Sequence, residues 1–135
     1  MVDVAEFALN FINDYVLKRL NSDEKKYFRS RTRQLYSMAY FENLKSTIAF
    51  AYSKAKENAV KSLVENKEIN VKEDSKKDHA YYLLGIIKLL KEEGYQVDGS
   101  IDSLMKAIKD KSIENKILNY MKWLKYFAEA KIEGG

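Results

Sequence analysis

The sequence contains no cysteine, no proline, only five glycines and a single histidine, His79. Without cysteine the chain can form no disulfide, no thiolate metal site and no cysteine nucleophile, and this composition is typical of the reducing cytoplasm, where we expect the protein. One histidine without cysteine is also too small a set for a zinc site or for a histidine-activated nucleophile. Because His79 stands at the start of the most apolar segment, we expect a structural or capping role for it.

Other functional classes lack their sequence patterns as well. The five glycines form no phosphate-binding loop, and residues 98–102 (DGSID) lack the twelve-residue pattern of a calcium loop. The longest apolar run, residues 80–87, ends at Lys88 and is far too short to span a bilayer. The carboxylates mostly alternate with lysines, as they do on a solvated helix face. We therefore expect no enzymatic activity, no cofactor, no metal and no membrane association.

A hydrophobic share of 46% beside a charged share of 33% indicates a folded globular chain. The length of 135 residues fits a single domain, which we expect to span residues 1–135. Alanine, leucine, lysine and glutamate are abundant and proline is absent, so the chain favours helices. No segment alternates apolar and polar residues for long enough to indicate a strand. The sequence thus predicts an all-α fold, a compact bundle of five to six mainly antiparallel helices without a sheet.

Apolar residues recur at three- and four-residue spacing along most of the chain, which is the pattern of amphipathic helices. Asn21 and Ser22 are candidate caps of the second helix, Asn43 marks a break after it, and Gly94 ends the fourth. The predicted helices cover roughly residues 3–20, 23–40, 44–64, 79–93, 101–109 and 112–132, with a charged loop over 66–78. We expect the fourth helix to be the most buried. The side chains predicted to be almost fully buried are Leu83, Ile86, Leu90, Leu124 and Phe127.

Arginine is concentrated in one stretch of the chain. All four arginines lie between residues 19 and 33, whereas the remaining cationic residues are lysines. Residues 18–33 hold seven basic and two acidic side chains, while residues 1–17 hold three acidic and no basic ones. The planar guanidinium group binds phosphate through two donors and stacks on flat rings. This local group of arginines is therefore a candidate surface for binding a polyanion.

A helix turns by about 100° per residue, which places five side chains of the second helix on one stripe: Lys26, Arg29, Arg33, Tyr36 and Tyr40. This stripe combines positive charge with aromatic rings. Arg31 falls instead at the edge of the apolar face. Cationic side chains beside rings that can stack on bases are typical of nucleic-acid binding. The same stripe fits a solvated face that pairs with the acidic first helix, or a docking face on a helical adaptor that binds only protein. The residues alone leave these interpretations open.

Three segments in this order resemble one known family: residues 27–35 (YFRSRTRQL), residues 43–50 (NLKSTIAF) and residues 123–130 (WLKYFAEA). They are similar to an arginine-rich segment, a turn leading into a helix and a C-terminal motif in the small helical subunit of the Cmr complex, the type III-B CRISPR RNA-guided effector. The resemblance covers most of the chain except about residues 54–78. Tyr36 stands where the family often has proline, and residues 42–44 (ENL) replace a glycine-containing turn, whose geometry asparagine tolerates.

The resemblance implies a non-catalytic subunit that serves antiviral defence. Copies of it would stack in a short filament beside the backbone subunits that hold the guide RNA, and would line the groove in which target RNA pairs with the guide. Target cutting in that complex belongs to the backbone subunit. The implied partners are the other Cmr subunits, copies of the chain itself, and guide and target RNA. The arginine-rich motif assigns RNA contact to Arg29, Arg31 and Arg33, which Lys25, Lys26 and Lys45 join by charge and position.

Overall fold

The structure is a computed structural model that describes residues 2–67 and 74–134. Within these ranges every regular element is a helix and no strand occurs, so the predicted all-α fold is confirmed. In chain order the elements are α1 Val4–Phe11, η1 Ile12–Val16, α2 Leu17–Arg19, α3 Ser22–Phe41, α4 Leu44–Ala55, α5 Glu57–Val64, α6 Asp74–Glu92, α7 Ile101–Ala107 and α8 Lys111–Lys131.

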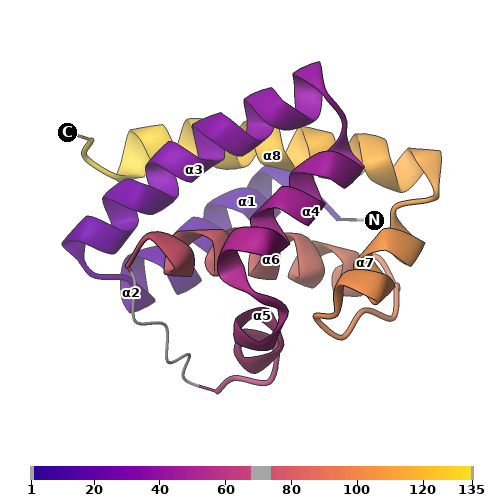
Figure 1. Cartoon of the computed structure of the whole chain (residues 1–135). Coiled ribbons are helices and arrows are strands. Elements are labelled where there is room, and N and C mark those ends of the chain that lie inside the picture. The colour runs from indigo at the N-terminus through magenta and orange to yellow at the C-terminus, as the bar shows by residue number, and fades with distance from the viewer. Residues whose placement is uncertain (1, 68–73, 135) are drawn as a thin grey trace.

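The central helix of the bundle is α6, against which α1, α3, α4 and α5 all pack (Figure 1). From Asp78 to Leu90 every side chain of α6 is buried except that of Lys88. Leu83 and Ile86, two of the predicted core residues, are at most 1% exposed. The expectation that this helix is the most buried is confirmed, and its apolar surface provides a large part of the hydrophobic stabilisation of the fold.

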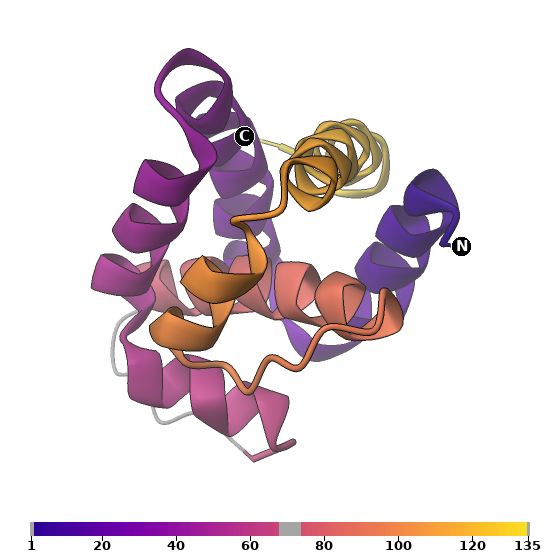
Figure 2. The same ribbon diagram turned by 90° about the vertical axis from the view of Figure 1, so that its right-hand side faces the viewer.

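The first and third helices lie on opposite sides of the last one. α8 packs against both α1 and α3, and Figure 2 shows α1 and α3 on opposite sides of α8. Leu124 of α8 is fully buried as predicted. The prediction for Phe127 is wrong, because the buried row of α8 continues from Leu124 to Ala128. Phe127 is half-buried at the edge of this row and stacks on Trp123, with 5.7 Å between ring centroids.

Two of the predicted helices, those over residues 3–20 and 44–64, contain an irregularity that the sequence did not predict. The first is continuous, but in η1 the amide N–H of Leu17 donates to the carbonyl oxygen of Ile12, which makes a wider π turn. The predicted single helix over 44–64 is wrong: Lys56 has a φ of 73° and separates α4 from α5. A lysine with positive φ cannot continue a right-handed helix, and neither glycine nor proline marks this break in the sequence.

The start of α6 also differs from its prediction. It begins at Asp74 and not at His79, so part of the predicted loop over 66–78 is helical, while residues 68–73 lie outside the described residues. The predicted cap at Asn21, the break at Asn43 and the stop at Gly94 are confirmed. Asn21 and Asn43 cap α3 and α4 with their side-chain oxygens, and Gly94 ends α6 with a φ of 91°. Helix ends in this chain therefore follow from local sequence, except at Lys56 and at the start of α6.

Candidate nucleic-acid interface

The start of α3, the helix that carries three of the four arginines, is fixed by a capping box. The Asn21 side chain accepts the backbone N–H of Glu24 at 2.9 Å, and the Glu24 carboxylate accepts the backbone N–H of Asn21 at 2.8 Å. The Nζ of Lys77 on α6 lies 3.2 Å from the other oxygen of the Glu24 carboxylate. These contacts satisfy N–H groups that a helix start leaves unpaired and hold the first turn of α3 against α6.

Side-chain contacts cross the seam between α3 and α8, which run antiparallel (Figure 1). The Nε of Arg33 donates to the carboxylate of Glu129 at 3.2 Å. One turn later on α3, the Lys125 ammonium lies 5.8 Å from the centroid of the Tyr36 ring. The seam between α3 and α8 is thus covered by one ion pair and one cation–π contact, both at the molecular surface.

Arg29 is directed toward the C-terminal segment. A Cβ atom added to Gly134 would lie 2.6 Å from the Cζ of Arg29, so the guanidinium packs directly on that backbone. The Nε of Arg29 is buried and has no hydrogen-bond partner within the described ranges. The predicted stripe is therefore only partly accessible. Its exposed members are Lys26, Arg33 and Tyr40, and its half-buried members are Arg29 and Tyr36.

Arg31 forms an ion pair with a buried carboxylate. Its Nε donates to the Oδ2 of Asp78 on α6 at 2.7 Å, and its Nη1 donates to the side chain of Gln34. The Asp78 side chain is fully buried, and its Oδ1 accepts the backbone N–H of His79 at 2.7 Å and lies 2.8 Å from the Nδ1 of His79. Arg31 thus compensates a buried carboxylate, which would otherwise be very costly to desolvate. The sequence indicates an edge position for Arg31 but contains no signal for this partner.

The six residues predicted to bind RNA do not form one patch. α3 brings together Lys25, Lys26 and the arginines, whereas Lys45 lies in the first turn of α4, beyond the other end of α3. A rise of about 1.5 Å per residue puts Lys45 on the order of 20 Å from Lys26. The exposed members are Lys26, Arg33 and Lys45, and the half-buried members are Lys25, Arg29 and Arg31.

The sequence analysis missed the part of this surface that α8 supplies. Tyr126 of α8 is 51% exposed, and the ammonium of Lys125 lies 5.3 Å from the centroid of its ring. Lys122 lies in the same way 5.0 Å from the centroid of the Trp123 ring. The aromatic residues at three- and four-residue spacing in the C-terminal motif were the available signal, but they indicated a core face. Their partial exposure depends on where α3 crosses α8, which the sequence does not specify.

An acidic helix face lies on the other side of the molecule. Asp3, Glu6 and Asp14 of the first helix are all exposed, and Figure 2 shows this helix across α8 from α3. The Asp14 carboxylate lies 3.9 Å from the Nζ of Lys18, at the limit of an ion pair. The charge is thus locally uneven, because the first helix carries only acidic charges up to Asp14, before Lys18 and Arg19 at its end.

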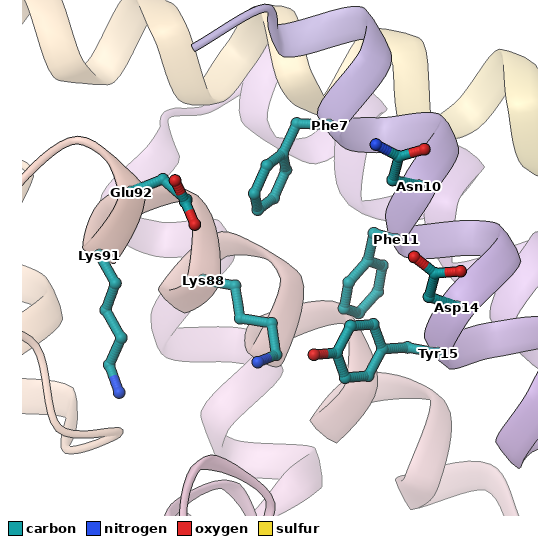
Figure 3. Close-up of a pocket in the computed structure, with 8 residues that line it drawn as sticks. All are labelled: Phe7, Asn10, Phe11, Asp14, Tyr15, Lys88, Lys91 and Glu92. Atoms are coloured by element: carbon teal, nitrogen blue, oxygen red, sulfur yellow. The ribbon is translucent and has the colours of Figure 1, made fainter. Parts of the chain in front are cut away.

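A pocket of about 460 Å³ opens between the first helix and α6. Figure 3 shows Phe7, Phe11 and Tyr15 along one wall, with Lys88 directed toward Tyr15. Phe11 stacks on Tyr15 with 5.2 Å between centroids, and the Lys88 ammonium lies 4.6 Å from the Tyr15 centroid. The wall is completed by Asn10, Asp14, Lys91 and Glu92. Two lysines and two carboxylates face the same space, so its charge favours neither an anion nor a cation.

The described residues contain no group of three or more histidine, aspartate and glutamate side chains arranged to hold a metal ion. No helix within the same ranges is long and apolar enough to cross a membrane.

Comparison with known proteins identifies a family over nearly the whole chain. Residues 2–131 match the family model described as CRISPR-associated protein (Cas_Cmr5). Comparisons with curated proteins and with solved structures give no significant match. The matched range includes α3, α8 and the acidic first helix, so the candidate interface lies inside the family region. The chain therefore belongs to the Cas_Cmr5 family and is a CRISPR-associated small subunit of the type III-B Cmr effector.

Proposed function

We propose that the protein is a non-catalytic RNA-contacting subunit of the Cmr effector, and that the outer face of α3 lies against the phosphate backbone of the paired guide and target RNA. The observation that carries this proposal is the pair of exposed cationic side chains, Lys26 and Arg33, on a helix whose opposite face packs on the core. In this role the protein acts in the cytoplasm, in antiviral defence. Its partners are the other Cmr subunits and copies of itself.

The chemistry of this face suits sequence-independent binding. A groove that accepts any guide must contact phosphates and not base edges, and cationic side chains on a rigid helix do so. Lys26 forms no ion pair within the described ranges, and Arg33 is held only by a half-exposed pair with Glu129. An exposed pair of this kind is worth less than about 1 kcal/mol, so a phosphate readily takes the place of Glu129.

The three arginines of α3 have different roles in this proposal. Arg33 and Lys26 contact RNA directly, whereas Arg31 is held by Asp78 and positions the helix. Arg29 has its guanidinium against the Gly134 backbone, so it contributes positive potential and reaches a phosphate once the C-terminal segment moves aside. Few contacts per copy give weak binding. Several linked copies in a row bind the same RNA much more tightly than one copy does, through multivalency.

The uneven charge distribution supports stacking of copies. A contact between the acidic face of one copy and the basic flank of the next is heterologous, because the two surfaces differ, and it propagates without closing. Such a row would present the α3 faces of successive copies along one line. Ion pairs across these contacts weaken as salt rises.

The proposal is tested by a salt series on reconstituted Cmr complex that carries either wild-type subunit or the variant Lys26→Ala with Arg33→Ala. We expect the variant to bind target RNAs of unrelated sequence more weakly by similar factors. The slope of log affinity against log salt should become shallower by about 0.7 to 0.9 for each phosphate that the variant no longer binds. The matched control removes the same charge elsewhere, through Lys106→Ala with Lys109→Ala, two exposed lysines at α7.

The rival function is a helical adaptor that uses the same face to bind an acidic protein. It gains some support from Arg31 and Arg33, which already have carboxylate partners in this structure. If the Lys26→Ala and Arg33→Ala variant keeps the wild-type salt slope but no longer enters the complex, the α3 face docks protein. An unchanged slope together with normal assembly would show that this face contacts neither RNA nor a neighbouring subunit.

A further inference from the structure

A group of aromatic side chains lies on α3 and α8, on both sides of the seam between these helices. We name it the aromatic ridge, and it consists of Tyr36, Tyr40 and Phe41 on α3 and Trp123, Tyr126 and Phe127 on α8. Phe41 is 82% exposed and Tyr40 is 72% exposed. Apart from Tyr27, every large hydrophobic side chain that is mostly exposed in the described ranges belongs to this ridge. Exposed rings gathered in one place mark an interaction site, whereas scattered ones do not.

The rings contact one another within each helix, and Lys125 connects the two groups. On α3 the centroids of Phe41 and Tyr40 are 5.2 Å apart, and those of Tyr40 and Tyr36 are 6.5 Å apart. Lys125 bridges the seam, with its ammonium 5.8 Å from the Tyr36 centroid and 5.3 Å from the Tyr126 centroid. The ring spacings on α3 are those of packed aromatic pairs, and Lys125 brings the α3 and α8 groups together through cation–π contacts.

On α8 the same chain of contacts continues inward from Tyr126. Its ring lies 6.4 Å from that of Trp123, which stacks on Phe127. Lys122 lies over the Trp123 ring, so two lysines are interleaved with the rings of the ridge. The Glu129 carboxylate at the seam is bound to Arg33, while the exposed Glu42 follows Phe41 in the chain. The ridge therefore carries positive charge at Tyr36, Trp123 and Tyr126, next to the more exposed rings of Tyr40 and Phe41.

This composition distinguishes between two kinds of partner. The buried centres of protein–protein interfaces are enriched in aromatic residues but depleted of lysine. Sites for single-stranded nucleic acid instead combine rings on which bases stack with cationic side chains that follow the backbone. A duplex offers no free base faces, because its bases are already stacked on one another. Lysine interleaved with exposed rings thus favours a single strand with unpaired bases.

We propose that the aromatic ridge stacks unpaired bases of single-stranded RNA, with Tyr40 and Phe41 as the outer platform and Lys122 and Lys125 at the phosphates. The inference rests on the proposed RNA-contacting function and extends it, since the phosphate contacts of Lys26 and Arg33 require no unpaired base. The two surfaces share α3, so a strand that leaves the paired region can pass from one to the other.

The test measures binding of the full chain at low salt to three labelled RNAs of equal length: a single strand, the same strand without bases, and a perfect duplex. Wild-type protein should prefer the base-bearing single strand. The variant Tyr40→Ser with Phe41→Ser should lose about tenfold in affinity for each base that no longer stacks. Its affinity for the abasic strand should not change. The matched control is Tyr27→Ser, which removes an exposed ring of α3 that lies outside the ridge.

A second readout follows the bases directly. A single strand that contains 2-aminopurine should lose fluorescence on binding wild-type protein, because stacking quenches it, and should keep it with the double variant. Equal binding of base-bearing and abasic strands, unchanged by the double substitution, overturns the stacking inference and leaves the phosphate role of α3 intact. Absence of any RNA binding at low salt overturns both. Normal RNA binding by the double variant together with loss of complex assembly shows that the ridge docks a protein.

Discussion

Replacing Arg31 by alanine should destabilise the fold far more than replacing Arg33, although both arginines lie on the same helix. Arg31 is the cation that compensates the carboxylate of Asp78, at 2.7 Å from its Oδ2. The Asp78 side chain is 0% exposed and that of Arg31 is 24% exposed, so water has little access to the pair. The pair of Arg33 with Glu129 is longer, at 3.2 Å, and its members are 51% and 28% exposed.

The magnitudes follow from these burials. Removing one partner of a buried ion pair costs about 3–5 kcal/mol, since the other charge remains buried and uncompensated. Asp78 keeps its hydrogen bond from the backbone N–H of His79, and some water can enter beside the shortened side chain. We therefore expect Arg31→Ala to lower the free energy of unfolding by about 2–3 kcal/mol. Arg33→Ala removes a largely solvated pair and should cost less than about 1 kcal/mol.

Urea denaturation followed by circular dichroism measures both variants against wild type. Asp78→Asn with Arg31→Ala should restore part of the loss, because the uncompensated charge is then absent, and the double-mutant cycle should give a coupling of about 1 kcal/mol or more. A cost below about 0.5 kcal/mol for Arg31→Ala, or equal costs for the two arginine variants, would contradict the role assigned to the Asp78 contact.

Other variants test the core, one close contact and one exposed carboxylate. Leu90→Ala, in the fully buried part of α6, should cost about 2–5 kcal/mol in the same denaturation assay. Gly85→Ala should lower the free energy of unfolding by about 1–3 kcal/mol, because the added Cβ would meet the Tyr120 hydroxyl and lie 3.2 Å from the Phe11 ring. A neutral effect would show that these side chains move freely. Hydrogen bonds, chiefly from Ser100, lower the pKa of Asp98 from 3.8 to about 2, so its charge stabilises the fold above pH 4 and this contribution is lost as pH falls toward 2. Asp98→Asn should therefore lower the free energy of unfolding by no more than about 1 kcal/mol at pH 7, because the group is exposed. The difference from wild type should vanish near pH 2.

Local sequence was sufficient to predict most of the helices. The asparagine caps, the glycine stop and the apolar periodicity each act within a few residues, so their structural effect can be read along the chain. The break at Lys56 could not be read in this way. No residue there favours positive φ, and the break follows from the way α4 and α5 both pack against α6. Tertiary packing overrides helix propensity at that point.

The sequence predicted which residues of the candidate site lie on the surface of α3, but not which side chains they contact. Helical periodicity correctly put Lys26 and Arg33 on the outside of α3 and Arg31 at the edge of the core. The partners of the arginines were not predictable, because Asp78 and Glu129 come from helices far along the chain. Phe127 was assigned to the core by the same periodicity, which reports an apolar face but not where that face ends.

The central claim is that α3 touches RNA in the assembled effector, and ultraviolet cross-linking of the complex to target RNA tests it most directly. Cross-linked peptides from this subunit are mapped by mass spectrometry, with the cross-links of the backbone subunits as the internal positive control. We predict that the RNA-bearing peptides of this subunit include residues 22–41, and that Lys26→Ala with Arg33→Ala reduces the yield of these α3 peptides. Cross-links in the backbone subunits without any from α3, or cross-links confined to the acidic first helix, would contradict the account.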